Sequence, residues 1–116
     1  METFKDDRGE INKLDIKGTR VNLLYTKKGA LRSGDIHPNN QFNVILSGEI
    51  EITYRKGNKD VKEIKKPNEL IMTPAGVPHL FKFTKDTVLL EWWDGPFKAE
   101  YYAPYRKFVD ESLKKK

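Results

Sequence analysis

The chain contains only two histidines, His37 and His79, and each lies next to a turn signal in a strand-rich region. Histidine titrates near neutral pH and is a common metal ligand, so chemistry is expected at these positions. Asp35 and His37 are two residues apart on an extended segment, which places their side chains on the same face. After the turn at residues 38–40, Gln41 can return to the same cavity. These residues are the first candidates for a polar site.

Two further features indicate which side chains point inward. His79 alternates with Phe81 and Phe83, so this largely aromatic face is expected to point into the protein. Two consecutive tryptophans follow Glu91, and on a strand their indoles point to opposite faces, so one of them enters the interior or its mouth. Trp93 shares a face with Glu91, and both are candidates for contact with a ligand, although an inward indole is more often part of the core.

The elements that must position these residues are short strands separated by glycine, proline and asparagine turns. Strands are expected at residues 21–25, 41–46, 49–54, 61–64, 69–73, 79–83 and 87–93. One helix is expected over residues 104–114. It begins at a proline, which suits a first helical turn, and it packs on the outside of the protein through a stripe formed by Tyr105, Phe108, Val109 and Leu113. Many short strands with one terminal helix predict an all-β sandwich or barrel.

The region around the second histidine resembles a motif of the cupins, a family of small β-barrel proteins. Their second motif has the form G-x5-P-x-G-x2-H-x3-N. It is matched here at Pro74, Gly76 and His79, with Asn68 in place of the first glycine and Phe83 in place of the final asparagine.

The region around the first histidine resembles the other cupin motif, G-x5-H-x-H-x3-4-E-x6-G. His37 occupies the second histidine, Gln41 the glutamate and Gly48 the closing glycine, whereas Asp35 replaces the first histidine. The resemblance covers residues 21–92. It implies an all-β, cupin-type double-stranded β-helix, or jelly-roll barrel, with one C-terminal α-helix. The expected organisation is a single domain over residues 1–116 with its barrel at about 21–93.

In cupins that bind metal, the three histidines and the glutamate hold one divalent ion. The corresponding set here is Asp35, His37, Gln41 and His79. Two imidazoles and a carboxylate suit Fe, Mn, Zn or Ni, but a neutral amide is a weaker ligand than glutamate. The alternative is that both histidines are hydrogen-bonded pocket residues in a cupin without metal.

A narrower resemblance, to cupins that isomerise or epimerise nucleotide-linked 4-keto sugars, favours the alternative without metal. It rests on Asp7-Arg8-Gly9, on Arg32-Ser33-Gly34-Asp35-Ile36-His37, on the following segment from Gln41 through Asn43 to Gly48, and on a tyrosine-rich ending. The resemblance implies that these isomerases need no cofactor.

The same resemblance implies specific roles. His37 exchanges a proton beside a ketone, Asp35 fills the place of the other histidine, and Arg32 holds a phosphate or polarises the ketone. Gln41, Asn43 and His79 then contact substrate, together with Trp93 and Glu91. For Arg32, a surface salt bridge is an equally good interpretation.

Composition excludes several classes of function. The chain has no cysteine, which excludes disulfides and thiolate chemistry. It has no apolar stretch of membrane-spanning length, and an intracellular, cytoplasmic setting is expected. The net charge of +5 arises from 22 basic and 17 acidic residues and forms no concentrated basic stripe, so nucleic acid is not an expected partner.

The favoured function at this stage is isomerisation or epimerisation of a carbonyl sugar. The alternatives are a metal-dependent cupin, such as a small dioxygenase, and a non-catalytic module that binds a sugar or effector. A homodimer is expected, because the segment up to residue 25 has strand character that can pair with a second copy.

Overall fold

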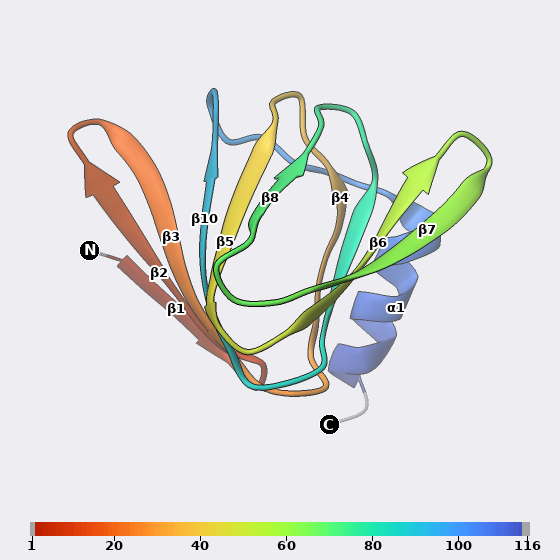
Figure 1. The fold of residues 1–116 in the computed structure, drawn as a ribbon, viewed down its shortest axis with the longest axis horizontal. Coiled ribbons are helices and arrows are strands. Elements are labelled where there is room, and N and C mark those ends of the chain that lie inside the picture. The colour runs from red at the N-terminus through yellow and green to blue at the C-terminus, as the bar shows by residue number, and fades with distance from the viewer. Residues whose placement is uncertain (1, 115–116) are drawn as a thin grey trace.

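The chain folds into eleven strands and one helix within residues 2–114, the part that this computed structural model describes (Figure 1). The strands are β1 (Glu2–Asp6), β2 (Gly9–Ile16), β3 (Thr19–Thr26), β4 (Leu31–Ile36), β5 (Gln41–Ser47), β6 (Ile50–Lys56), β7 (Lys59–Lys65), β8 (Leu70–Thr73), β9 (His79–Phe83), β10 (Thr87–Trp93) and β11 (Glu100–Tyr101). The helix is α1 (Ala103–Lys114).

The strands form two antiparallel sheets that face each other. One sheet has the order β1-β2-β3-β10-β5-β8, and the other has the order β11-β4-β9-β6-β7. Strands that are distant in sequence are therefore neighbours in space, because β10 lies between β3 and β5 and β9 lies between β4 and β6. This is a jelly-roll arrangement. It confirms the predicted all-β barrel with one C-terminal helix.

Each inward face changes from apolar to polar along the barrel. The apolar end is filled by a cluster of buried side chains: Leu24, Ile45, Ile50, Ile52, Ile71, Phe81, Phe83 and Leu89. Toward the other end of β10, Leu89 is followed on the same face by Glu91 and Trp93, and along β9 Phe83 and Phe81 lead to His79. The two-residue period of the strands thus places the polar candidates together at one end of the barrel.

The N-terminal segment differs from expectation. The barrel was expected to begin near residue 21, but the first sheet already includes β1 and β2, which pair with each other and then with β3. The segment therefore pairs within its own chain, and only the outer edge of β1 remains open. The sequence indicated strand character up to residue 25 but not the bounds of β1 and β2, because charged residues obscure their alternation, as in the β2 sequence GEINKLDI.

Helix α1 covers the outer face of the second sheet, as Figure 1 shows on the right. Tyr105 and Val109 are buried there against Leu80, in agreement with the prediction that the helix packs on the outside of the barrel. Phe108 was expected in the same stripe, but it is 46% exposed. Phe108 precedes Val109 by one residue, so it lies about 100° around the helix from Val109. The buried face of α1 is therefore narrower than the predicted apolar stripe. Within residues 2–114, no helix has the length and apolar character needed to cross a membrane.

We expect Gly34→Ala to lower the free energy of unfolding by about 2–3 kcal/mol. Gly34 has φ 72°, and an added Cβ would lie 2.9 Å from the backbone Cα of Arg106 in α1. Gly57 is the matched control, because it has φ 63° and open space around its Cβ position. Gly57→Ala should cost only the backbone strain, about 1 kcal/mol. Urea denaturation measures both values, and equal losses would show that α1 does not depend on this close approach.

Candidate functional site

The residues predicted for the site come from four strands and the loop after β4, and they gather at the polar end of the barrel. A cavity of about 280 Å³ opens there, and its lining includes Arg32, Asp35, His37, Gln41, Glu91 and Trp93. His79 and Asn43 do not line the cavity. Both are fully buried beside Gln41. Asn43 accepts a hydrogen bond from Nε2 of Gln41, and Nε2 of His79 lies near Oε1 of Gln41.

A bulge in β4 sets the direction of the residues before His37. The register of β4 against β9 shifts between Ser33 and Asp35, and both Ser33 (φ 77°) and Gly34 (φ 72°) adopt left-handed backbone conformations. Arg32 and Asp35 are three residues apart and would lie on opposite faces of a regular strand. The extra residue brings both into the cavity, which is a common use of bulges near functional sites.

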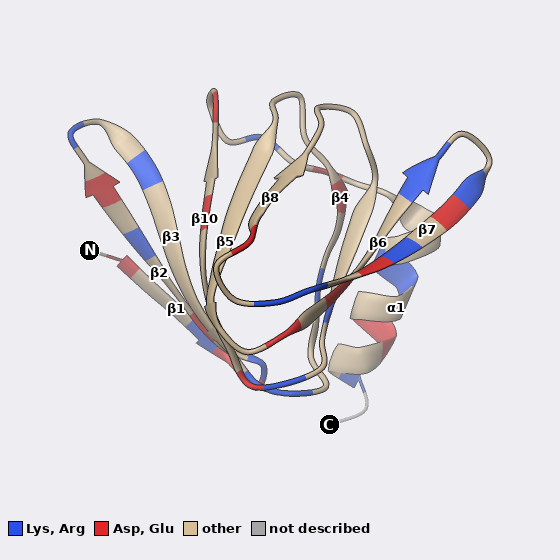
Figure 2. Ribbon diagram, in the orientation of Figure 1, with Lys and Arg blue, Asp and Glu red and all other residues tan. Residues whose placement is uncertain are grey.

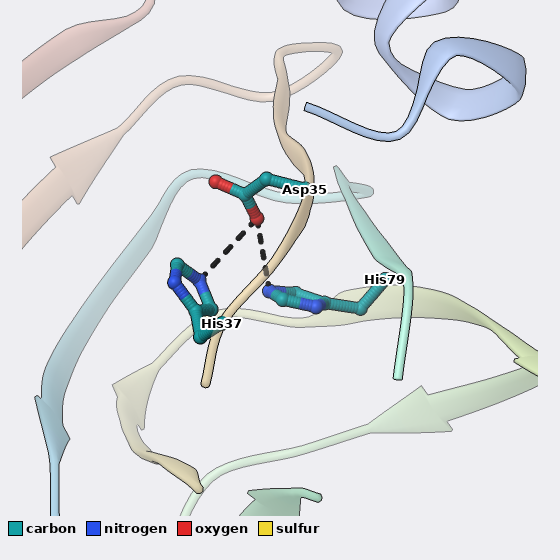
Figure 3. A group of neighbouring side chains, drawn as sticks. All are labelled: Asp35, His37 and His79. Atoms are coloured by element: carbon teal, nitrogen blue, oxygen red, sulfur yellow. Dashed lines mark ion pairs between the residues drawn. The ribbon is translucent and has the colours of Figure 1, made fainter. Parts of the chain in front are cut away.

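The two histidines and Asp35 form a compact group (Figure 3). The Oδ1 atom of Asp35 lies 3.4 Å from Nε2 of His37 and 3.2 Å from Nε2 of His79. This oxygen is buried and has no hydrogen bond of normal geometry to any described residue. One possible ligand atom from each of the three residues lies within 4.8 Å of the others.

The other nitrogen of each ring faces a backbone carbonyl. Nδ1 of His37 lies 2.7 Å from the carbonyl oxygen of Lys98, and Nδ1 of His79 lies 3.1 Å from that of Val77. A carbonyl oxygen only accepts, so each contact needs a proton on Nδ1. Each ring therefore has acceptor oxygens at both nitrogens, while a neutral imidazole carries a single proton.

Gln41 presents its carbonyl oxygen to the group. Asn43 donates from Nδ2 to the carbonyl of Leu90 at 3.2 Å, which leaves its Oδ1 to accept from Nε2 of Gln41 at 2.8 Å. Oε1 of Gln41 consequently lies toward His79, 3.2 Å from Nε2. A fixed backbone carbonyl thus determines, through Asn43, which end of the Gln41 amide faces the histidines.

The two histidines have opposite pKa shifts. Burial lowers the pKa of His37, but the Asp35 carboxylate and the hydrogen bond to the Lys98 carbonyl outweigh it, so that the pKa is raised above 6.5. For His79 burial prevails over Asp35, and the pKa is lowered. His79 is therefore neutral near pH 7, and its single proton cannot satisfy acceptors at both nitrogens. A cation bound at Nε2 would leave the Nδ1 proton for Val77.

In protein treated with a chelator, the two rings should titrate on opposite sides of pH 6.5. The ring signals of His37 should shift with a midpoint above pH 6.5, and those of His79 with a midpoint below it, because the carboxylate stabilises one imidazolium and burial disfavours the other. Proton NMR across pH 5–8 measures both midpoints, and His37→Asn assigns the signals. A His37 midpoint below that of His79 would contradict this description of the electrostatics.

Arg32 is not on the surface, which corrects the salt-bridge interpretation. Its side chain is 5% exposed, and its Nε donates to Oγ1 of Thr26 at 2.9 Å. Its NH2 group is buried without a hydrogen-bond partner among the described residues. Burial, reinforced by the nearby Arg8 charge, lowers the pKa of Arg32 to about 10. Arg32 remains charged at neutral pH and is a buried cation next to the cavity.

Trp93 is the inward indole, and Glu91 lies beside it on β10. The Trp93 ring packs edge-on against His37 at 5.4 Å between centroids and against Phe97 at 4.6 Å. Glu91 is within 3.5 Å of Nδ2 of Asn43. Burial raises the pKa of Glu91, an effect that its hydrogen bonds to Asn43 and Asn22 only reduce.

Several contributors to the site were not predicted. Phe97 and the Lys98 carbonyl belong to the segment after the last long strand, where the sequence has no periodicity, and the Val77 carbonyl is a backbone group. Arg8 also lines the cavity. Arg8 belongs to the Asp7-Arg8-Gly9 segment that carries the narrower resemblance, but the sequence predicted no role in the site for it, because the β1–β2 turn that places it there was not predicted.

Comparison with known proteins places the fold. A sequence model of the cupin domain matches residues 23–93. Among solved structures, CapF with the inhibitor 3-isopropenyl-tropolone is similar to this chain, with a TM-score of 0.76 and 20% sequence identity. The match covers 86% of this chain and 33% of the CapF chain. CapF from Staphylococcus aureus, described as a capsular polysaccharide assembling protein, has a TM-score of 0.73 at 20% identity over 86% of this chain and 31% of its own.

A variant of the oxalate decarboxylase of Bacillus subtilis has a TM-score of 0.74 at 16% identity, over 86% of this chain and 30% of its own. The chain therefore spans about a third of the length of these solved proteins. No curated protein matches the sequence. At these identities the structural likeness concerns the fold.

Proposed function

The chain belongs to the cupin domain family, and from that premise we propose that it binds a divalent metal ion through Asp35, His37 and His79, next to a cavity that takes a small anionic ligand. One observation carries the proposal: both Nε2 atoms converge on a carboxylate oxygen that has no hydrogen bond of normal geometry within residues 2–114, while both Nδ1 atoms face carbonyls. Neutral imidazoles and a carboxylate are the donors expected for Fe, Mn, Zn or Ni.

The residues present fit such an ion. Oε1 of Gln41 would supply a fourth ligand atom, and it is held toward His79 by the hydrogen bond between Gln41 and Asn43. A bound divalent ion would supply Lewis-acid polarisation of an oxygen on the ligand. The carbonyls of Lys98 and Val77 orient the two rings and fix the nitrogen that remains available, a role that supporting hydrogen bonds have in metal sites generally.

Charge in the cavity supports an anionic ligand. Among the lining side chains five are basic, Arg8, Lys13, Arg20, Arg32 and Arg106, against two that are acidic. Arg8, Lys13 and Arg106 are each paired with a carboxylate outside the lining, so attraction of an anion into the cavity rests mainly on Arg20 and Arg32. With the resemblance to cupins that act on nucleotide-linked keto sugars, this favours a carbonyl sugar joined to phosphate as the substrate class. Glu91, whose pKa is raised by burial, is the lining group that we assign to take or return a proton.

A second candidate keeps the same ligand and uses no metal. In that case His37 is the proton-transferring group, as the narrower resemblance implies. The direction of its pKa shift favours this candidate: the Asp35 carboxylate and the Lys98 carbonyl raise the pKa of His37, and a proton-transferring group works best when its pKa lies near the operating pH. The metal proposal takes precedence because it accounts for the acceptors around His79, which a base at His37 leaves unsatisfied.

Thermal unfolding of chelator-treated protein tests the metal proposal. Mn²⁺, Fe²⁺, Zn²⁺ or Ni²⁺ should raise the unfolding temperature in a saturable manner, by about 2.7 kcal/mol of added stability at 100 times the dissociation constant. Ca²⁺ is the control, because it prefers sites made only of oxygen. If none of the four ions changes the unfolding temperature, the metal proposal is wrong.

A further inference from the structure

The barrel is open along one side, between the edge strands of its two sheets. Within residues 2–114, β8 pairs only with β5 and ends one sheet, while β7 pairs only with β6 and ends the other. In Figure 1 the loop of residues 66–69 leaves β7, crosses to the other sheet and enters β8. A groove of about 270 Å³ lies along this opening, and we call it the β7–β8 groove. It shares no lining residue with the cavity at the polar end of the barrel.

Much of the lining of the β7–β8 groove is aliphatic. Ile52 and Ile71 are its most buried lining residues, and both belong to the main apolar cluster of the barrel. Leu70 and Met72 line it from β8 and are 62% and 50% exposed, and Val77 lines it from the loop before β9. An apolar surface that faces water favours an apolar occupant, because binding removes that surface from water.

The strand edges beside the groove do not favour an added peptide strand. β8 has only four residues, and β7 carries Lys59, Lys62 and Lys65 along an edge where lysine opposes pairing with another chain. The volume of 270 Å³ equals that of about nine water molecules in the liquid. The occupant that fits is therefore a compact small molecule of roughly eight to ten non-hydrogen atoms.

The charged groups that line the groove favour an anionic ligand. Glu63 is already engaged, because its Oε2 accepts a hydrogen bond from the Tyr54 hydroxyl and its Oε1 lies 3.3 Å from Nζ of Lys65. The ammonium of Lys65 carries three N–H groups. Its other ion-pair partner among the described residues, Glu69, is 3.8 Å away, which is beyond hydrogen-bond distance. Lys65 therefore has N–H groups available to a ligand, whereas Glu63 has no oxygen left for a cation.

The charge around the groove has the same sign. Residues 56–69 carry five lysines and three acidic residues, and Figure 2 shows blue segments along β7 and in the loop that follows it. Lys66, which directly follows Lys65, forms no ion pair within residues 2–114. β8 on the opposite side carries no charge. The excess of lysine attracts anions to this end of the groove.

We propose that the β7–β8 groove binds a short aliphatic carboxylate, with its chain against Ile52, Ile71 and Val77 and its carboxylate on Lys65. The aliphatic lining accounts for the chain, the volume for its length, and the available N–H groups of Lys65 for the carboxylate. The site uses none of the residues of the proposed metal site and does not depend on it.

The groove borders the strands that carry two of the polar side chains in the barrel. Tyr54, which lines the groove, is the register partner of His79 on β9. Thr73, also in the lining, is the register partner of Gln41 on β5. The carbonyl of Val77 faces Nδ1 of His79. A ligand in the groove is thus separated from His79 and Gln41 only by residues that contact or pair with them.

Titration of the wild-type protein with hexanoate, followed by NMR, tests the proposal. The amide signals of Thr73 and Val77 should shift in a saturable manner, with a dissociation constant of about 1 mM or lower. Each methylene added from propanoate to hexanoate should tighten binding by about twofold to fourfold, because it is placed against the aliphatic lining. Hexylamine has the same chain and the opposite charge, and it should bind at least about tenfold more weakly. The amide signals of Arg32 and Glu91 report binding in the other cavity.

Lys65→Glu should invert the preference, so that hexylamine binds more tightly than hexanoate. Lys62→Glu is the matched control: Lys62 lies on the same strand and does not line the groove, so this variant should keep the wild-type preference. Circular dichroism shows whether both variants are folded.

Three results would overturn the proposal. The first is the absence of a saturable shift at Thr73 and Val77 in the wild type, including the case in which only the signals of Arg32 and Glu91 move. The second is equal affinity of the wild type for hexanoate and hexylamine, which would assign the groove to an uncharged ligand. The third is a folded Lys65→Glu variant that keeps the wild-type preference for hexanoate.

Discussion

His79→Ala is expected to reduce the affinity for divalent metal by at least about 100-fold. Replacing a residue that only supports a metal ligand already costs about 10–100-fold in affinity, and this change removes one of the two imidazoles that converge on Asp35. Competition between the protein and a chelator of known affinity measures the change. Because His79 is fully buried, circular dichroism is needed to show that the variant is folded.

Lys82→Ala is the matched control for His79→Ala. Lys82 lies on the same strand, β9, and is exposed, so its replacement should leave the metal affinity unchanged. A folded His79→Ala variant with wild-type affinity would place the ion elsewhere or exclude it.

His37→Asn is expected to reduce turnover of a nucleotide-linked 4-keto sugar by two to four orders of magnitude. Asparagine is smaller and cannot exchange a proton near neutral pH, and its amide is a poorer ligand than imidazole. Steady-state kinetics together with metal analysis of the same variant separate the two candidate functions. In the metal proposal, turnover and bound metal are lost together. If His37 acts as the base, turnover falls, while ligand binding and metal content are those of the wild type.

Glu91→Gln completes this comparison. Glu91 is 3.5 Å from Asn43 and does not belong to the three-residue group, so the variant should keep its metal and lose turnover. Wild-type turnover in Glu91→Gln would show that this carboxyl group handles no proton in the reaction. Absence of turnover in the wild type with any keto sugar would leave metal binding as the tested property and favour a binding module.

The strands that frame the site could be predicted because their residues alternate cleanly. His79–Phe83 and Thr87–Trp93 begin and end where the pattern indicated. The pattern did not give the bounds of β1 and β2, because charged residues occur on both faces of this hairpin: Lys5 and Glu10 on one face, and Lys13 and Asp15 on the other. Asn68 replaces the first glycine of the second cupin motif and still keeps a backbone conformation typical of glycine. Its φ is 70°, which asparagine tolerates better than most residues.

The composition of the site was easier to predict than its geometry. The two-residue spacing of Asp35 and His37 correctly placed both at one cavity, and Gln41 returned to it after the turn. The bulge at Ser33 and Gly34 could not be predicted, because a register shift depends on the partner strand β9. For the same reason the burial of Arg32 was missed. The Lys98 carbonyl is 61 residues from His37 in the sequence. The Val77 carbonyl is only two residues from His79, but a backbone group carries no side-chain signal.

Metal content of the purified protein tests the central claim most directly. Elemental analysis of wild-type protein, incubated with Mn²⁺, Fe²⁺, Zn²⁺ and Ni²⁺ in turn and then desalted, should find about one ion per chain for at least one of these metals. The His79→Ala variant treated in parallel should retain almost none. Protein that emerges free of all four metals, or that holds equal amounts with and without His79, would contradict a metal site formed by Asp35, His37 and His79.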